Sequence, residues 1–345
     1  QMCLPLPVVT QLLEGLRADH LLEVISHSGP FGYNYSATSR GREHAQRLME
    51  ISGYIGPTPV SLEDYISGLE FQFQHLPPVC PDEIKEAIAQ MVLPENAHHI
   101  GGLAVMSRRS LFLYGPPGNG KTTLGHLLHN AVHGNLWIPQ AIGVDNEVIQ
   151  LFDAECHELA EDDASEQALI RTDARWVNIK RPMIVVGGEL TMEALDLVYD
   201  PGHGHYGAPL HFKANGGTFL LDDFGCQRMP PQELLNRWIH PMERGVDFLT
   251  LRTGQQLEVP FRQMLIVSTN LDPDRIMSPA FLRRMGYRLH LPNPSREMYA
   301  DIFRRYADRC QVSVPTELLD RLFNRYAAEQ RPLRSCEPRD LIERA

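Results

Sequence analysis

A glycine-rich segment with a single lysine has the residue types and the spacing of a phosphate-binding loop. It follows a short apolar run, residues 111–114, and precedes a stretch with helical periodicity, which is the context that such a loop requires. Its glycines let successive backbone N–H groups point at phosphate oxygens, and the helix that follows adds its positive amino-terminal end. The predicted contact residues are Gly115, Pro116, Pro117, Gly118, Asn119, Gly120, Lys121, Thr122 and Thr123. Lys121 is expected to bridge the β and γ phosphates of ATP, and Thr122 to hold Mg²⁺.

Two adjacent acids end a second apolar run, residues 218–221. Phosphoryl transfer needs a carboxylate close to the metal ion and a group that orients the attacking water. Asp222 suits the first role and Asp223 the second. Asn270 ends a neighbouring run and is expected to polarise the water or to touch the γ phosphate. The alternative for these three residues is a solvated strand end or an ordinary turn.

Five short apolar runs, separated by helical segments, predict the elements that position these residues. Their lengths suit strands buried on both faces of a sheet. The runs are Leu111–Tyr114, Met183–Val186, Thr218–Leu221, Met264–Ser268 and Tyr287–Leu291. The pattern predicts an α/β fold with a five-stranded parallel core. From Ser295 onward the apolar spacing is helical, which predicts a small helical lid.

The first fifty residues read as a helix, a hairpin and a second helix. Apolar residues recur at helical spacing over 8–24, a turn cluster covers 27–32, and 33–37 is typical of a strand. The segment resembles the back half of a winged-helix domain, whose junction between strand and helix is matched by Tyr35 to Glu43. Its charges are balanced and leave no basic face, so both docking of a protein and reading of DNA stay open.

The predicted domain organisation has four parts. A winged-helix-like unit covers 1–52, a linker 53–80, a nucleotide-binding domain 81–291 and a helical lid 292–345. The nucleotide-binding domain carries an insertion at about 134–181, including a hairpin over 137–152 that turns at Asp145-Asn146. The chain opens without Met and ends inside an apparent helix, so both edge domains are expected to be truncated.

Over residues 81–345 these motifs together resemble the AAA+ ATPases. The quoted stretches are the phosphate-binding loop, the Walker B run 219–223, a sensor-1-like Asn270, residues 280–289 as the arginine-finger segment and 337–341 as the start of the sensor-2 helix. The resemblance implies that a finger arginine reaches the ATP of a neighbouring subunit, while sensor 2 acts within its own subunit. It offers Arg284 first, Arg283 second and Arg288 third as the finger, and Arg339 as sensor 2.

One departure from that family concerns the hydrolytic residue. Most members place Glu after the Walker B Asp, whereas this chain has Asp223, which is one methylene shorter. Initiator and helicase-loader members also show Asp-Asp, so the departure predicts slow turnover and leaves activity open.

Residues 213–225 resemble the approach to Walker B in sigma-54 activators and chelatase-like AAA+ proteins. Those families project a loop toward their substrate from an insertion before this strand, and the matching stretch here is 199–209. Tyr206 or its neighbours are therefore expected to touch a substrate, against the alternative of an ordinary surface loop. The whole arrangement also resembles a group of bacterial AAA proteins, and that resemblance names no substrate.

Composition limits the remaining possibilities. The 345 residues carry a net charge of −11, so any DNA contact has to be local. There is no apolar run of about 18 residues and no leader pattern, and the six cysteines are scattered singly. These features predict a cytoplasmic protein without membrane insertion. His126, His129 and His133 share a helical face, but without a Cys or carboxylate nearby a packed or solvated face is favoured over a metal site.

Three functions follow from the sequence. The leading one is an ATPase in a homo-oligomeric, hexameric ring that remodels a protein partner. The alternatives are an ATP-controlled DNA-binding regulator or loader, and a nucleotide-gated scaffold with little hydrolysis.

Overall fold

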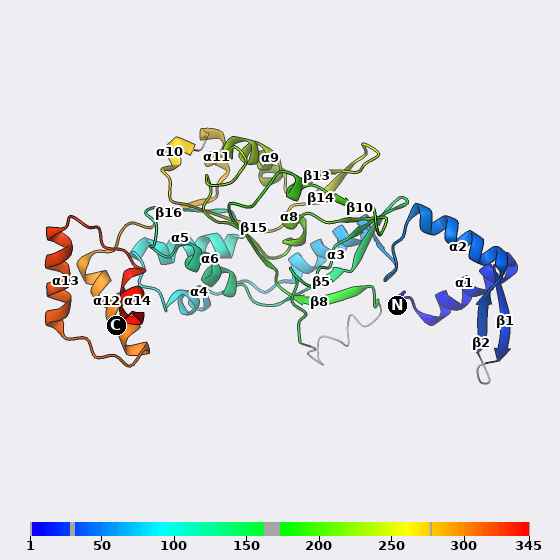
Figure 1. Ribbon diagram of the computed structural model, residues 1–345, viewed down its shortest axis with the longest axis horizontal. Helices are drawn as coiled ribbons and strands as arrows, with labels where there is room; N and C mark the ends of the chain where they lie inside the picture. The colour runs from blue at the N-terminus through cyan, green and yellow to red at the C-terminus, as the bar shows by residue number, and fades with distance from the viewer. Residues whose placement is uncertain (1, 28–31, 162–172, 277, 345) are drawn as a thin grey trace.

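The computed structural model describes residues 2–27, 32–161, 173–276 and 278–344. Figure 1 shows an elongated chain whose amino-terminal unit and carboxyl-terminal helices lie at opposite ends of the long axis. The sheet that carries the predicted site lies between them. Within the described residues, no helix combines the length and the apolar character needed to cross a membrane.

The predicted five-stranded parallel sheet is confirmed. Its strands are β4 (Leu111–Tyr114), β9 (Met183–Val186), β12 (Thr218–Leu221), β15 (Met264–Thr269) and β16 (Tyr287–His290). The order across the sheet is β16-β4-β15-β12-β9, and each neighbouring pair is parallel. In this order β4 and β12, which precede the phosphate-binding loop and the acids, are separated only by β15, which precedes Asn270.

Helices cover both faces of this sheet. Successive strand residues point to opposite sides, so the apolar side chains on each face need a cover. Phe219 and Leu221 pack in one apolar cluster with Trp238, while Leu220 packs in a second cluster with Leu124. The covering helices are α4 (Pro81–Ile88), α5 (Glu95–Ser107), α6 (Lys121–Asn130), α9 (Pro231–Arg244) and α11 (Pro279–Arg284). Burial on two sides holds the strand ends, and the polar residues that follow them, in fixed positions.

The insertion contributes two strands to a second sheet, which strands from before and after it complete. The predicted hairpin is confirmed as β6 (Ala141–Val144) and β7 (Glu147–Gln150), with Asp145 at φ 51° in the turn. The other elements are β3 (Val60–Ser61), β5 (Asn135–Pro139), β8 (Trp176–Lys180), β10 (Val198–Asp200) and β11 (His205–Gly207). The second sheet has the order β10-β11-β7-β6-β3, while β5 pairs with β8. Residues 162–172 of the predicted insertion lie outside the described residues.

Two expectations are corrected in this region. The segment 53–80 contains α3 (Leu62–His75), whose Tyr65 and Leu69 are buried in the core of the insertion, so this helix belongs to the packed unit and not to a linker. Tyr206 is only 1% exposed in the same core, and its hydroxyl accepts a hydrogen bond from the backbone N–H of Arg252. Burial leaves Tyr206 no free surface for a substrate, so the expectation is corrected for this residue, while for its neighbours, among them the exposed His203, it stays a prediction.

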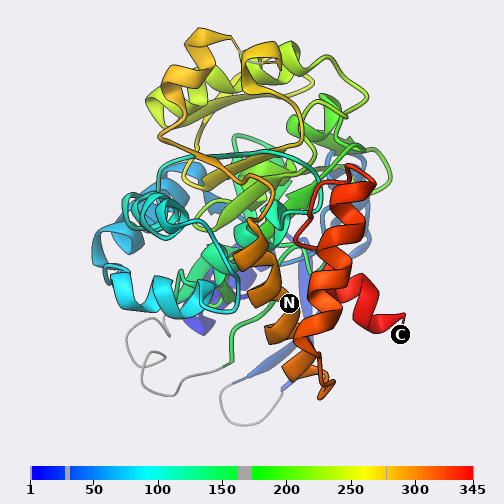
Figure 2. The same ribbon diagram turned by 90° about the vertical axis from the view of Figure 1, so that its left-hand side faces the viewer.

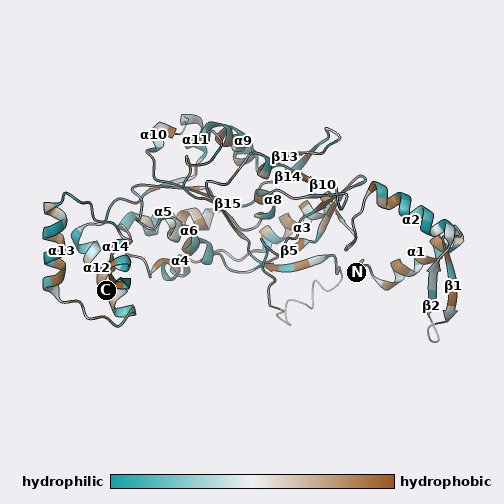
Figure 3. Cartoon of the chain, viewed as in Figure 1, coloured by the Kyte–Doolittle hydropathy of each residue, from teal (hydrophilic) through white to brown (hydrophobic). Residues whose placement is uncertain are grey.

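The amino-terminal unit has the predicted order of helix, hairpin and helix, with one changed boundary. It consists of α1 (Leu6–Ala18), β1 (Leu22–His27), β2 (Tyr33–Ala37) and α2 (Ser39–Ile51). The first helix ends earlier than predicted, because residues 22–27 pair with β2 as a strand. Figure 3 shows α2 mostly in hydrophilic colours, consistent with an exposed helix. The winged-helix assignment stays a prediction.

The lid is helical as predicted. It contains α12 (Arg296–Arg309), α13 (Thr316–Ala328) and α14 (Glu337–Glu343), which face the viewer in Figure 2. The Ser295 hydroxyl caps α12 by accepting a hydrogen bond from the Met298 N–H at 3.2 Å. Tyr299, Phe303 and Tyr326 form a separate small core.

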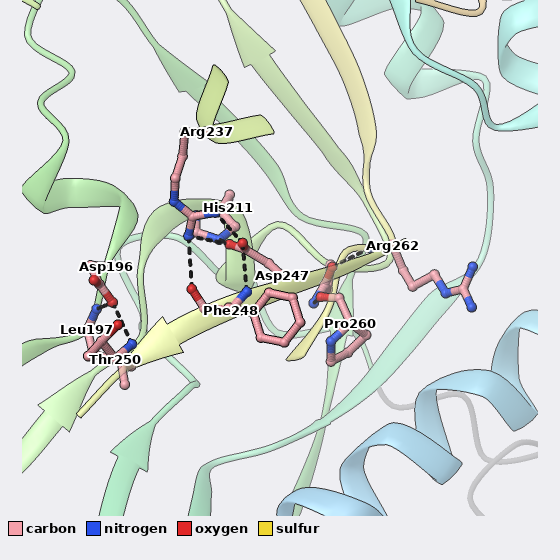
Figure 4. Close-up of polar contacts among 10 residues, drawn as sticks. Asp196, Leu197, His211, Arg237, Asp247, Phe248, Thr250, Pro260 and Arg262 are labelled. Atoms are coloured by element: carbon pink, nitrogen blue, oxygen red, sulfur yellow. Dashed lines mark hydrogen bonds and ion pairs between the residues drawn. The ribbon is translucent and has the colours of Figure 1, made fainter. Parts of the chain in front are cut away.

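A buried ionic cluster fixes the hairpin of β13 (Val246–Thr250) and β14 (Gln256–Pro260) against the sheet's covering helices. Asp247 accepts hydrogen bonds from Arg237 of α9 and from His211 of α8 (Leu210–Lys213), as Figure 4 shows. Burial raises the pKa of Asp247, but the hydrogen bonds from His211 and Arg237 outweigh it and hold this pKa below its ordinary value. The carboxylate therefore stays charged and joins three elements.

His129 of α6 gives the fold an acid-sensitive contact. Its Nδ1 lies 2.9 Å from the Thr218 hydroxyl, and burial, aided by repulsion from His126 and Arg181, lowers its pKa to about 4. Because the unfolded chain binds this proton near pH 6.5, folding stability is complete above that pH and is lost as the pH falls toward 4. We expect His129→Gln to reduce the stability difference between pH 7 and pH 4.5 by on the order of 1–3 kcal/mol. Urea unfolding at both pH values measures this difference, with His99→Gln, an exposed histidine of α5, as the matched control. Equal pH dependence in both variants would contradict the assignment.

Candidate functional site

The loop between β4 and α6 has the backbone geometry that the sequence predicts for holding phosphate. Gly115 and Gly118 have φ of 138° and 81°, which residues with a side chain rarely adopt. A Cβ at Gly115 would lie 2.2 Å from the Leu291 carbonyl oxygen, so only glycine lets this loop pass the end of β16. The loop leads directly into the first turn of α6, where backbone N–H groups without a partner inside the helix are suited to bind an anion.

Lys121 is held over this loop by oxygen atoms. Its Nζ donates hydrogen bonds to the carbonyl oxygens of Gly115 and Pro116, both at 2.9 Å, and to Asn270 Oδ1 at 2.7 Å. The side chain is only 6% exposed. Burial lowers the pKa of Lys121, while Asp223 and Asp222 act in the opposite direction. A desolvated ammonium in this position has strong attraction for an incoming phosphate.

The two acids each have a separate polar partner. Thr122 Oγ1 donates to Asp222 Oδ2 at 2.7 Å, across one hundred residues of sequence. Asn270 Nδ2 donates to Asp223 Oδ1 at 2.7 Å, and its Oδ1 receives the Lys121 bond, so Asn270 links the lysine to the second acid. Asp223 is exposed and has φ of 46°, in the left-handed region that residues with a side chain seldom adopt. The structure thus brings together Lys121, Thr122, Asp222, Asp223 and Asn270.

Contacts from the lid were not predicted from the sequence. The Ser335 N–H donates to Asn119 Oδ1 at 3.2 Å, and the Cys336 N–H donates to the Gly118 carbonyl at 2.9 Å. Asn119 also donates to Asn293 Oδ1 at 3.0 Å, which ties the loop to the segment between β16 and the lid. Two of these three contacts are made by backbone N–H groups, which any residue type except proline supplies, so the sequence carries little signal for them.

The arginines of the lid differ in their distance from the loop. Arg339 bonds its neighbour Asp340 at 3.3 Å, and in the described part of the chain no contact joins it to the phosphate-binding loop. Arg334, which was not singled out from the sequence, comes close: a Cβ placed on Gly118 would lie 3.7 Å from Arg334 Cδ. Among the loop residues, Pro117, Gly118 and Thr123 are exposed.

The three finger candidates lie away from this loop. Arg283 and Arg284 end α11, and Ser110, the residue before β4, holds this segment by accepting a hydrogen bond from the Gly286 N–H at 3.1 Å. Arg288 lies early in β16, beside Phe112 of β4. Since β4 spans four residues, at about 3.3 Å each, the α11 pair is separated by roughly the length of that strand from the loop at its other end. Arg284 bonds Glu243 of α9 at 3.0 Å.

Comparison with known proteins gives limited similarity. The family described as a domain of unknown function (DUF8689) matches residues 295–345, the lid. No curated protein matches the chain significantly in sequence. Among solved structures, NtrX from Brucella abortus in complex with ATP is 13% identical, with a TM-score of 0.36 over 79% of this chain and 46% of NtrX. A mutant of RuvB from Thermotoga maritima is 14% identical, with a TM-score of 0.36 over 69% of this chain and 54% of RuvB. The chain thus matches only about half the length of these proteins.

Proposed function

We propose that this chain is a magnesium-dependent ATPase of the AAA+ type that works as a homo-oligomeric ring on a protein partner. The observation that supports it most is the meeting of the phosphate-binding loop, the Thr122–Asp222 pair and the Asp223–Asn270 pair at the carboxyl edge of one parallel sheet. Ligands bind at this edge in open α/β sheets.

The groups proposed to bind ATP are the backbone amides of the loop, the amino-terminal end of α6 and Lys121. A γ phosphate oxygen is a better partner for the ammonium than the two carbonyl oxygens that hold it at 2.9 Å, because that bond pairs opposite charges. When Lys121 turns to the phosphate, Asn270 loses its bond to Lys121 and keeps its bond to Asp223. Binding of ATP therefore changes the surroundings of the acid that acts on water.

The oxygen atoms of Thr122 and Asp222 suit Mg²⁺. A hydroxyl and a carboxylate that already meet at 2.7 Å are hard oxygen donors of the kind this ion takes together with phosphate oxygens. The ion supplies charge neutralisation for the phosphates when it is bound. Asp223 is then the residue that orients the attacking water and accepts its proton, held in place by Asn270.

The position of the α11 arginines supports a ring. Arg283 and Arg284 lie about one strand length from their own phosphate-binding loop, and their charge is useful at that distance only to a neighbouring subunit. A contact that joins the α11 end of one copy to the loop of the next is heterologous and closes into a ring when the rotation permits. Within one subunit, the lid is proposed to contact the bound ATP. Arg339 is the predicted sensor, and Arg334 lies close to Gly118 of the loop.

A cytoplasmic location belongs to the same proposal. Five cysteines are thiols outside disulfides, namely Cys80, Cys156, Cys226, Cys310 and Cys336. Unpaired thiols at scattered positions favour a reducing compartment.

The ring is tested by the mass of the purified chain in solution. We expect light scattering to show a multiple of 39.1 kDa with a nonhydrolysable ATP analogue and Mg²⁺, and a smaller mass without nucleotide, because the γ phosphate completes the contact surface for the neighbour's arginine. The Lys121→Met variant under the same conditions is the control. A monomer in every condition would exclude the ring while leaving the ATP site intact.

A further inference from the structure

A large cleft lies at the edge of the central sheet opposite to the phosphate-binding loop. Its volume is about 980 Å³, and its lining includes Ser110, Thr218 and Met264, which stand at or before the starts of β4, β12 and β15. The volume lies at the upper end of the range of about 300–1,000 Å³ that is typical of small-molecule sites. The residues assigned above to ATP, Mg²⁺ or water within one subunit lie outside this lining, whereas Arg283 and Arg284, which are proposed to serve the ATP of a neighbouring subunit, belong to it.

The lining of the cleft is strongly cationic in a chain whose net charge is −11. Seven arginines contribute to it, against two glutamates. Each glutamate is engaged: Glu70 lies 3.8 Å from Arg262, and Glu243 lies 3.0 Å from Arg284. The remaining five, for which the described residues contain no ion pair, are Arg108, Arg109, Arg181, Arg244 and Arg283. Positive charge is therefore in excess throughout the cleft.

Two buried side chains of the lining have polar atoms that the fold leaves unpaired. Arg181 is 7% exposed; its Nε donates to the His133 carbonyl and its Nη1 to the Gly216 carbonyl, but its Nη2 has no hydrogen-bond partner among the described residues. Gln263 is 8% exposed, and in the described part of the chain both its Nε2 and its Oε1 lack a hydrogen-bond partner. A buried donor or acceptor without a partner costs about 1–3 kcal/mol, so such atoms are expected where a ligand completes them.

The charges in the cleft also repel one another. Burial, and then repulsion from Arg108, lowers the pKa of Arg181 to about 10, and burial also lowers the pKa of Arg108. Arg108 is further held over the ring of Phe73 at 5.2 Å. An anion between these guanidinium groups would relieve this repulsion.

We propose that this cleft binds a small phosphate-bearing ligand in the single subunit, separately from that subunit's own ATP site. Guanidinium groups pair with phosphate through two parallel hydrogen bonds, which suits a lining with several of them. Gln263 offers one donor and one acceptor, so the ligand also carries a hydrogen-bond donor such as a hydroxyl or an amine. A buried floor of this kind selects a compact ligand over a duplex of nucleic acid, which lies along an open basic surface.

The two sites are joined by the strands between them. Thr218 begins β12 at the cleft, and Asp222 follows the same strand at the ATP site. The Thr218 hydroxyl also contacts His129 of α6, the helix that starts at Lys121. Arg262 lines the cleft and follows the end of β14. Figure 4 shows its side chain extending away from the Asp247 cluster. A ligand in the cleft therefore contacts elements that hold the catalytic residues.

Titration calorimetry with inorganic tripolyphosphate tests the proposal. The full chain carrying Lys121→Met serves as the parent, since it weakens phosphate binding at the other site. We expect this parent to bind one tripolyphosphate in the cleft, and the pair Arg109→Gln with Arg244→Gln to weaken that binding about tenfold or more. Both arginines are exposed, so their replacement leaves folding intact. Arg304→Gln, an exposed arginine of the lid, is the matched control and keeps the parent affinity.

A second variant separates a ligand role from a structural one. Gln263→Leu removes the two unpaired atoms at similar volume, and we expect thermal stability to stay equal or rise while tripolyphosphate affinity falls about tenfold. Binding that neither set of substitutions changes would overturn the proposal. Two other results would also overturn it. One is tripolyphosphate binding that appears only when the chain self-associates, which would assign the cleft to a second copy. The other is binding of duplex DNA without binding of tripolyphosphate.

Discussion

Replacing Lys121 by methionine is expected to abolish ATP hydrolysis, lowering the steady-state rate of phosphate release by about 10²–10³-fold or more. Methionine retains the length of the side chain and removes the charge. The Lys121 ammonium is the buried cation of the loop, directed at oxygen atoms of Gly115, Pro116 and Asn270, and no other lysine or arginine contacts these atoms in the described structure. Its loss removes the group that neutralises charge on the transferred phosphoryl.

The fold should survive this substitution. Burial lowers the pKa of Lys121, so removing its charge relieves a desolvation cost that offsets the loss of its three hydrogen bonds, and thermal stability is expected to stay close to that of the parent. Lys85→Met is the matched control: Lys85 is an exposed lysine of α4 that pairs only at the surface with Asp82, and its loss should leave the rate unchanged. Hydrolysis at the unaltered rate in a folded Lys121→Met chain would remove the ATP site from the proposal.

The sequence predicts the central site well because each of its parts is local. Glycines before a lysine, two acids after an apolar run and an amide after the next run each occupy a few adjacent residues. The strands they follow are mostly apolar on both faces, which is typical of strands buried on both sides of a parallel sheet. Once those strands lie in one parallel sheet, the side chains at their ends meet, and the distances of 2.7 Å around Asp222 and Asp223 follow.

The parts that escaped prediction depend on contacts between distant segments. Tyr206 lies in a stretch rich in glycine and histidine that reads as a loop, yet it pairs beside Ile149 in the second sheet, a partner that no local pattern reveals. Ser335 and Cys336 reach the loop through their backbone. The arginine-lined cleft draws residues from positions 70 to 286, each of which is unremarkable in its own segment. Only the folded arrangement shows that their charges share one space.

Replacing Arg284 by alanine is expected to lower ATP hydrolysis on the order of 10³-fold while leaving ATP binding within its own subunit intact. Arg284 lies near the start of β4 and cannot serve the loop at the far end of that strand, so its loss is felt in the next subunit. Its bond to Glu243 at 3.0 Å is a surface pair that a neighbour's phosphate can replace, since Glu243 is exposed. Arg283→Ala and Arg288→Ala, measured in parallel, show which of the three candidates carries the effect.

Mixing two inactive variants tests the shared site directly. A Lys121→Met subunit lacks a working loop but still offers Arg284, and an Arg284→Ala subunit has the converse defect. In a randomly mixed ring about one quarter of the interfaces join an intact loop to an intact arginine, so activity should return to about one quarter of the wild-type rate. Recovery on mixing has no explanation within a single subunit, because neither chain holds a complete site. A mixture no more active than its components would show instead that Arg284 acts only within its own chain. The proposal of a ring would then lose the argument that Arg284 serves a neighbouring subunit.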